Sequence, residues 1–139
     1  MSTIIVDASV GVKWFVPEEH SDVAALLLDE NVDLEVPRLF FSEFGNILWK
    51  KFTRDELSHK DVVDSARGLR SAMLIPVPDE WLLDAAIALA CELKHPIYDC
   101  LYLALADSLE TAVVTADQKF ANQVADLARV VFVADFLKA

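Results

Sequence analysis

Short, uninterrupted apolar runs that alternate with helical segments constrain the fold of this chain more than any other feature of its sequence. The first run, Thr3–Val6, is rich in β-branched residues and ends at Asp7, which is typical of a strand covered on both faces. Short strands that each lead into a helix require parallel β–α–β units. We therefore predict an α/β fold, a three-layer α/β/α sandwich around a central, mainly parallel, five-stranded sheet. The expected strands are Thr3–Val6, Leu34–Val36, Leu74–Val77, Ala112–Thr115 and Val130–Val133.

Helical segments fill the intervals between these runs. Pro17 and Pro96 interrupt the pattern, because proline cannot continue a helix. Most of the aromatic residues Trp14, Phe40, Phe41 and Trp49 are expected in the core. The expected helices are Ala8–Phe15, Ser21–Glu30 with Ser21 as its cap, Arg38–Arg54, Ser58–Ala72, Asp79–Leu93, Tyr98–Leu109 and Asp117–Leu127, followed by a short terminal turn.

Length and composition fit one compact unit. The chain has 139 residues, 55 % of them hydrophobic, which is enough for the core of a single domain over 1–139. No apolar run approaches the roughly 20 residues of a membrane span, and the N-terminus lacks the basic region of a signal peptide. We expect a cytoplasmic protein with no membrane association.

The charge balance is acidic, with one local exception. Twelve basic residues stand against 23 acidic ones, a net charge of −11, which argues against a general nucleic-acid binder. Half of the basic residues lie between positions 50 and 70, and the group begins with Lys50, Lys51 and Arg54. This group is either an ordinary solvated helix face or a functional basic stripe on an otherwise acidic body.

Two acidic residues directly follow predicted strands. Asp7 ends the first strand, and Asp117 follows Thr115 after one residue. In parallel sheets, ligands bind beyond the carboxyl ends of the strands. An aspartate in this position can equally serve only as the cap of the next helix, so either residue alone leaves both interpretations open.

Two further acids lie on helix faces that are otherwise apolar. Glu43 lies one turn from Leu39 and one turn from Ile47, and Asp99 shares a face with Leu103. A buried carboxylate is costly unless it is paired or bound to a cation. The alternatives are a rim position for Glu43 and a capping role for Asp99.

If the four acids converge, their chemistry indicates a hard cation. Crowded carboxylates repel one another and resist ionisation, and the histidines show no ligand spacing to another His or Cys. Oxygen-only ligands suit Mg²⁺ or Mn²⁺. Such a site can activate a water molecule and stabilise in-line displacement at phosphorus.

Four segments together resemble the PIN-domain family, and in particular its VapC type, the toxin half of VapBC toxin–antitoxin pairs. They are IIVDASV at Ile4–Val10, SEFGNILWK at Ser42–Lys50, YDCLYLALA at Tyr98–Ala106 and VVTADQKF at Val113–Phe120. No single segment is specific, but their order and spacing are. The resemblance implies a parallel five-stranded α/β/α sandwich, a Mg²⁺- or Mn²⁺-dependent ribonuclease, a homodimer, and a cognate VapB-like antitoxin as partner.

The resemblance also assigns roles to particular residues. Asp7, Glu43, Asp99 and Asp117 match the acidic quartet that carries catalysis and holds the metal. The supporting residues that match are Ser9 and Thr115, the hydroxyls beside the first and last acids, and Asn46, one turn after Glu43. Cys100, where the family often has a smaller residue, leaves the quartet intact.

We therefore expect an endoribonuclease that cleaves RNA by metal-activated water. Lys50, Lys51 and Arg54 are the candidate RNA-binding residues, and exposed aromatic residues could stack on splayed bases. An arginine of the antitoxin could enter the acidic pocket, and the Phe40–Phe52 region could flank a groove for it. The alternatives are a non-catalytic PIN-like scaffold and a receiver-type phosphoacceptor module, although the adjacent pair of acids and the lysine of receivers are missing.

Overall fold

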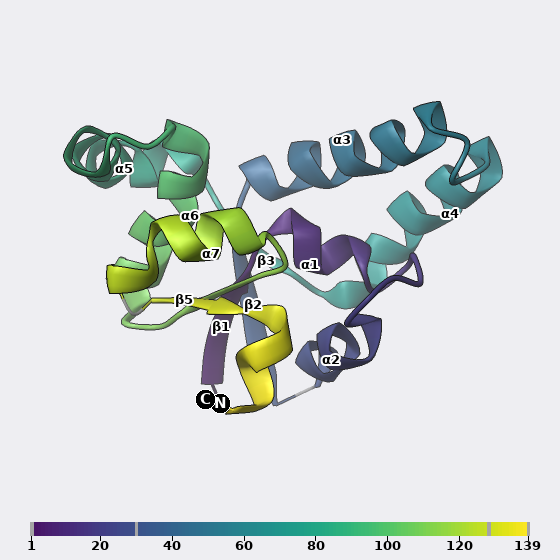
Figure 1. The fold of residues 1–139 in the computed structure, drawn as a ribbon, viewed down its shortest axis with the longest axis horizontal. Helices are drawn as coiled ribbons and strands as arrows, with labels where there is room; N and C mark the ends of the chain where they lie inside the picture. Colours follow the sequence, from purple (N-terminus) through teal and green to yellow (C-terminus); the bar gives the residue numbers. More distant parts are fainter. Residues whose placement is uncertain (1, 30, 128, 139) are drawn as a thin grey trace.

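A five-stranded, all-parallel sheet forms the centre of the molecule (Figure 1). In this computed structural model, residues 2–29, 31–127 and 129–138 are described. The strand order is β3-β2-β1-β4-β5, and helices flank the sheet, so the predicted α/β fold is confirmed. The strands are β1 (Ser2–Val6), β2 (Val32–Pro37), β3 (Ile75–Val77), β4 (Val113–Thr115) and β5 (Val130–Phe132).

Seven α-helices connect or flank these strands in the described residues. Ser58, where the sequence predicts that a helix begins, caps α4 (His59–Gly68): its hydroxyl accepts the Asp61 N–H at 3.1 Å, and the Asp61 carboxylate accepts the Ser58 N–H at 3.0 Å. The helices are α1 (Ala8–Val12), α2 (Ser21–Ala25), α3 (Leu39–Thr53), α4 (His59–Gly68), α5 (Asp79–Leu93), α6 (Ile97–Leu109) and α7 (Gln118–Gln123); short 3₁₀ segments cover Leu26–Leu28, Leu69–Ala72, Ala125–Leu127 and Val133–Lys138.

The direction of the strand order reverses between β1 and β4. The chain first builds outward from β1 through β2 to β3, and then returns to the other side of β1 for β4 and β5. Ile5 pairs with Val113 and Val6 with Val114 across this boundary. In open parallel sheets, the helices on either side of such a reversal diverge and leave a crevice at the carboxyl ends. The fold therefore offers a site where Asp7 and Asp117 lie.

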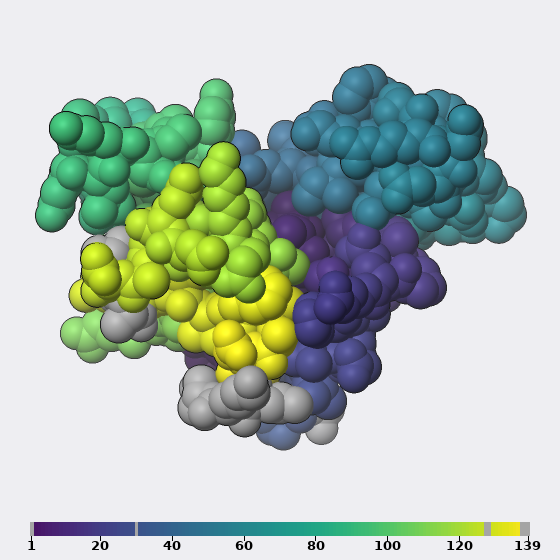
Figure 2. All heavy atoms as spheres, viewed as in Figure 1, coloured from purple at the N-terminus to yellow at the C-terminus, as the bar shows by residue number. Residues whose placement is uncertain are grey.

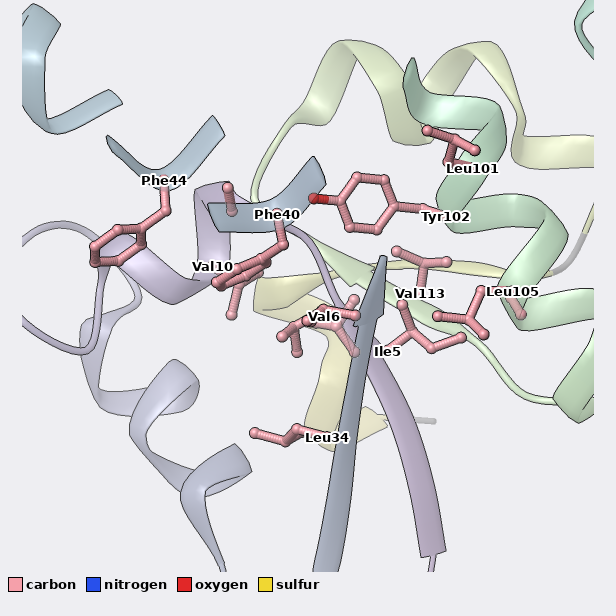
Figure 3. Packing of buried hydrophobic residues seen from close by; sticks show 14 of the residues in the cluster. Ile5, Val6, Val10, Leu34, Phe40, Phe44, Leu101, Tyr102, Leu105 and Val113 are labelled. Carbon is pink, nitrogen blue, oxygen red and sulfur yellow. The ribbon is translucent and has the colours of Figure 1, made fainter. Parts of the chain in front are cut away.

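Helix α6 carries an unbroken run of buried residues into the core. Its residues Cys100–Ala106 are all buried, and it packs against β1, β2, β4 and α5. Figure 3 shows Tyr102 and Leu105 of α6 beside Ile5 and Val113 of the central strands. A carboxylate on this helix is consequently held in a fixed frame.

Helix α3 is fixed against α1 by close packing of aromatic rings. The rings of Phe40 and Phe44 stack at 6.0 Å, and Phe40 lies against Gly11 of α1. A Cβ at position 11 would meet Cζ of Phe40 at 2.6 Å, which is closer than packed atoms approach. Gly11 thus allows the approach that brings α3 to the sheet edge.

The surface is hollowed between the lobe of α3 and α4 and the lobe of α5, with α7 in front (Figure 2). Both α3 and α5 project beyond the sheet edge in Figure 1.

No helix in the described ranges is long and apolar enough to cross a membrane.

Several predicted element bounds were wrong. The α-helix after β1 ends at Val12 and continues as turns rather than helix to Phe15. The predicted helix from Ser21 gives way to a 3₁₀ turn after Ala25, and its end at Glu30 lies outside the described residues. The cap position there is His20, because the Ser21 hydroxyl instead accepts the Glu18 N–H at 2.9 Å.

The prediction that most of four aromatic residues lie in the core was also wrong. Phe40 is fully buried and Trp14 is half-buried, but Phe41 is exposed and Trp49 is 57 % exposed. Phe41 and Trp49 lie about two turns apart on α3 and are both exposed, so the helix carries large apolar side chains outside its packed face as well.

Candidate active site

Asp7 leaves the central strand at its carboxyl end and enters helix α1. Its backbone N–H donates to Val114 O of β4 at 3.2 Å, and its Oδ1 accepts the Val10 N–H at 3.3 Å. The capping role that the sequence left open is therefore present. The Asp7 carboxylate also makes contacts that capping does not require.

Two hydroxyl groups hold the Asp7 carboxylate. Ser9 Oγ donates to Oδ1 at 2.5 Å, and Thr115 Oγ1 donates to Oδ2. The same hydroxyls accept backbone N–H groups after β4: Ser9 that of Ala116 at 2.9 Å and Thr115 that of Asp117 at 3.0 Å. The supporting residues Ser9 and Thr115 thus lie together at the junction of β1 and β4, and both contact Asp7.

Burial raises the pKa of Asp7 to about 6. The side chain is 9 % exposed, and loss of hydration disfavours the charged form. The hydrogen bonds from Ser9, Thr115 and Val10 lower this pKa, whereas the charge of Asp99 raises it further. Asp7 and Asp99 therefore act on each other electrostatically.

Glu43 of α3 is held by a tyrosine of α6. Tyr102 Oη donates to Glu43 Oε1 at 2.6 Å, and Figure 3 shows the Tyr102 ring extending from α6 toward α3. Burial raises the pKa of Glu43 to about 6, the bond from Tyr102 lowers it, and the charges of Asp7, Asp99 and Asp79 raise it. Burial and the Glu43 charge raise the pKa of Tyr102 far above its ordinary range, so its hydroxyl stays protonated as a donor.

Asp99 lies inside the first turn of α6 and does not cap it. The cap position is Pro96, and the helix start has no side-chain cap bond, so the capping alternative for Asp99 was wrong. Its Oδ2 lies 2.6 Å from Nε2 of His95. Because a carboxylate only accepts hydrogen bonds, the histidine Nε2 carries the proton.

Asp117 and Asn46 lie at the margin of this group. Asp117 is exposed and caps α7, where its Oδ1 accepts the Phe120 N–H at 3.1 Å. Asn46 is exposed on α3 one turn after Glu43. The structure therefore brings Asp7, Glu43 and Asp99 into mutual electrostatic contact, with Asp117 on the same sheet edge.

The donor set suits a hard divalent cation. As placed, the described residues contain no group of three His, Cys, Asp or Glu side chains arranged to hold a metal ion. The acids that influence one another nevertheless offer only carboxylate oxygens, the ligands that Mg²⁺ and Mn²⁺ prefer. His95 is hydrogen-bonded to Asp99 through its Nε2, so this nitrogen is already occupied by the carboxylate.

Comparison with known proteins decides the family. The chain matches the PIN domain over residues 4–125, most of its length. This chain belongs to the PIN-domain family. It is also 30 % identical, over 125 residues, to the Pyrobaculum aerophilum protein named Ribonuclease VapC3; the match covers 86 % of this chain and 93 % of that one.

Solved structures share this PIN fold. The crystal structure of PAE2754 from Pyrobaculum aerophilum superposes with a TM-score of 0.69 at 23 % identity, covering 88 % of this chain and 79 % of that one. A toxin–antitoxin complex from Klebsiella pneumoniae superposes with a TM-score of 0.66 at 14 % identity, covering 94 % of this chain and 97 % of that one. Mycobacterium tuberculosis VapC20, described as a sarcin–ricin-loop-cleaving toxin, superposes with a TM-score of 0.64 at 15 % identity, covering 87 % of this chain and 95 % of that one.

The receiver-type alternative is excluded by this family membership and by the topology. Receiver domains such as CheY have the strand order 2-1-3-4-5. The PIN domain described here has the order 3-2-1-4-5. The scaffold alternative keeps the same fold and remains a question of activity.

The structure separates the three basic candidates. Lys50 and Arg54 are exposed at the end of α3. Lys51 is only 17 % exposed, and its Nζ lies 2.6 Å from Oε2 of Glu18, which Lys13 also approaches at 3.3 Å. Lys51 therefore ties the loop before α2 to α3, and its charge is already compensated.

Sequence reasoning did not single out three residues that shape this site. Tyr102 and His95 lie three and four positions from Asp99, a helical spacing that could have marked them. Asp79, treated only as the start of a helix, accepts the Leu39 N–H at 3.2 Å at the beginning of α3. Each orients or influences a candidate acid without being one of the four.

Proposed function

We propose that this PIN domain is a Mg²⁺- or Mn²⁺-dependent endoribonuclease and the toxin component of a type II toxin–antitoxin pair. The observation that supports it most is the mutual influence of Asp7, Glu43 and Asp99 at the crevice between β1 and β4. A chain of this family with three interacting carboxylates in the expected crevice retains the chemical requirements of a nuclease. The relationship to Ribonuclease VapC3 supports RNA as the substrate.

In this proposal, Asp7, Asp99 and Glu43 would hold the cation, directly or through bound water molecules, and Asp117 would complete the charge or hold a second ion. When bound, Mg²⁺ or Mn²⁺ supplies Lewis-acid chemistry: it polarises the phosphate and increases the acidity of water. Ser9 and Thr115 fix the orientation of Asp7 by donating to both of its oxygens. Asn46 lies one turn from Glu43, where its amide can contact the substrate.

One carboxylate accepts the proton of the attacking water. Glu43 is suited to this role, because Tyr102 bonds its Oε1 and Oε2 can accept the proton. Burial raises its pKa above that of a free glutamate, which makes the carboxylate a stronger base for accepting a proton. Tyr102 then acts as a positioning residue for Glu43.

Metal-dependent cleavage is the direct test. The purified chain is incubated with a mixture of transfer, ribosomal and messenger RNA in the presence of Mg²⁺ or Mn²⁺. We expect discrete RNA fragments, loss of cleavage with EDTA and recovery on addition of excess metal, since the carboxylates act through a cation. A correctly folded chain that cleaves none of these RNAs with either metal would favour the non-catalytic scaffold.

We expect Lys50 and Arg54 to contribute to RNA binding more than Lys51 does. Replacing Lys50 and Arg54 with Ala should weaken RNA binding and reduce the slope of log Kd against log salt by about 2, because each phosphate contact releases about one counterion. Lys51→Ala is the matched control: it should mainly lower the melting temperature, since it breaks the bond to Glu18. An unchanged salt slope in the double variant would return both residues to the solvated-face interpretation.

An antitoxin partner follows from the proposed activity and from the Klebsiella toxin–antitoxin complex that shares the fold. An arginine can pair with two oxygens of a carboxylate and thereby compete with a cation for the acidic pocket. The exposed Phe41, Trp49 and Phe52 of α3 offer apolar surface for an amphipathic segment. We also propose that the domain spans 1–139, forms a homodimer and acts in the cytoplasm.

Coexpression with the neighbouring upstream gene tests the partner. The chain expressed alone should arrest growth, and coexpression should restore growth and yield a copurifying small protein with a basic tail. Cleavage by the isolated complex should be blocked and partly restored by excess Mg²⁺, if an arginine competes with the metal. Harmless expression of the chain alone would contradict the toxin assignment.

A further inference from the structure

Each candidate acid of this site is oriented by a donor elsewhere in the chain, and for Asp99 that donor is a histidine. Nε2 of His95 lies 2.6 Å from Oδ2 of Asp99, one helical turn later in the sequence. The His95 side chain is 12 % exposed, whereas that of Asp99 is 35 % exposed. The histidine is therefore the more enclosed partner of this pair.

His95 is fixed on its other side by α7. Its ring lies 5.8 Å from the ring of buried Phe120, at an angle of 36°. The backbone N–H of the same Phe120 donates to Asp117 at 3.1 Å. The imidazole therefore lies between α6, which carries Asp99, and α7, which Asp117 caps. The backbone N–H of His95 donates to Ala90 O of α5 at 3.1 Å.

The Asp99 carboxylate needs such a restraint. It is partly exposed near the start of a helix, and the charges of Asp7 and Glu43 interact with it unfavourably. Repulsion of this kind favours side-chain conformations that turn toward solvent. A charge-assisted hydrogen bond from a fixed ring opposes that rotation.

We propose that His95 is a positioning residue that holds Asp99 in the conformation required for cation binding. This inference rests on the proposed metal-dependent function. His95 takes one carboxylate oxygen and keeps the side chain directed toward Asp7 and Glu43. It acts as an N–H donor, so an uncharged imidazole is sufficient, and partners of this kind outside the ligand set govern how well a ligand is presented.

A purely structural role for His95 would depend on packing against Phe120, and two substitutions separate packing from donation. His95→Leu keeps apolar bulk beside Phe120 but removes the donor. His95→Gln removes the ring but places an amide N–H at nearly the same reach as Nε2. Should His95→Leu fail to fold, His95→Asn replaces it, because its amide is one methylene too short to reach Asp99.

The chain also offers a matched control on the same helix. Asp107 of α6 is 35 % exposed, like Asp99, and has one basic partner, Arg129. Arg129→Leu breaks this pair far from the crevice. Any general effect of removing a carboxylate's partner from α6 should therefore appear in this variant as well.

The experiment is calorimetric titration of the metal-stripped full chain with Mn²⁺, accompanied by circular dichroism of each variant. We expect about tenfold weaker Mn²⁺ binding in His95→Leu, within threefold of wild type in His95→Gln, and unchanged binding in Arg129→Leu. Binding by His95→Leu equal to wild type would overturn the positioning role and leave the proposed function intact. Binding by His95→Gln as weak as that of His95→Leu would also overturn it, in favour of packing. No Mn²⁺ binding by the folded wild type would overturn the metal-dependent function and this inference together.

Discussion

Replacing Asp7 with asparagine is expected to abolish RNA cleavage while the fold stays intact. Asparagine keeps the shape of the side chain and removes the negative charge that holds the cation. Lewis-acid stabilisation contributes several kcal/mol to a transition state, and each 1.36 kcal/mol is a factor of ten in rate, so cleavage should fall at least about 100-fold. The rate of RNA fragmentation in saturating Mg²⁺, compared with wild type, is the measurement.

The surroundings of Asp7 explain why the fold should tolerate this change. An asparagine Oδ1 can still accept from Ser9 and from the Val10 N–H, which Asp7 Oδ1 accepts at 2.5 and 3.3 Å. The Thr115 hydroxyl can rotate to accept from the new amide. Removing a buried charge also removes its desolvation cost, so the variant should unfold at a higher temperature than wild type at pH 7.5 without metal.

Asp61→Asn is the control for this prediction. Asp61 also receives a backbone N–H at a helix start, that of Ser58 at 3.0 Å, but it lies on α4 and is exposed. The Asp61→Asn variant should cleave RNA at the wild-type rate. Near wild-type cleavage by folded Asp7→Asn would show that the site has been assigned to the wrong residues, and circular dichroism must confirm that each variant is folded.

Much of this arrangement follows from short-range patterns. All five strands lie where the sequence predicted them. The reason is clearest for β1 and β4, because a strand covered on both faces contains little but apolar residues, whereas β2 also carries Asp33 and Glu35. Asp7 and Ser9 directly follow β1, and Thr115 ends β4. The sequence placed these residues at strand ends, but that β1 and β4 are neighbours in the sheet, and that the residues therefore meet, is shown by the structure.

The partners that orient the acids were harder to predict. Tyr102 and Glu43 are 59 positions apart on different helices, and Lys51 and Glu18 are 33 apart. Helical periodicity indicates which face of each helix is apolar, but not the angle or register at which two helices pack. Pairings that depend on that packing become visible only in the three-dimensional structure.

The exposure of the α3 aromatic residues was mispredicted for a related reason. Phe41, Trp49 and Phe52 are exposed although their residue types usually lie in a core. Composition cannot distinguish a side chain buried within its own chain from one that a partner covers. The misprediction therefore falls where we propose that an amphipathic partner segment binds.

In the absence of metal, the chain should be less stable at pH 7.5 than at pH 5. Burial raises the pKa of Asp7 to about 6, above the value of 3.8 expected for an unfolded chain, and raises that of Glu43 to about 6 as well. Between the unfolded-state pKa of 3.8 and the folded-state pKa of about 6, the folded state binds more protons than the unfolded state. The free energy of unfolding therefore falls as pH rises through this window. One pKa unit corresponds to about 1.4 kcal/mol, and Asp7 alone should lower stability by about that amount between pH 5 and pH 7.5.

Urea unfolding at pH 5 and pH 7.5, in EDTA, measures this difference. Asp7→Asn should remove most of the Asp7 contribution, and Glu43→Gln should reduce the remainder. Glu18 does not obscure the result. Burial alone would raise its pKa, but the hydrogen bond and charge of Lys51 and the charge of Lys13 lower it overall. The stability that Glu18 contributes is therefore lost only at a more acidic pH than this window. Added Mg²⁺ should stabilise the protein more at pH 7.5 than at pH 5, because carboxylate ligands must be ionised to bind metal. Equal stability at both pH values, unchanged by Asp7→Asn, would mean that Asp7 is not held as a buried carboxylate with a raised pKa, and the electrostatic support for this site would be lost.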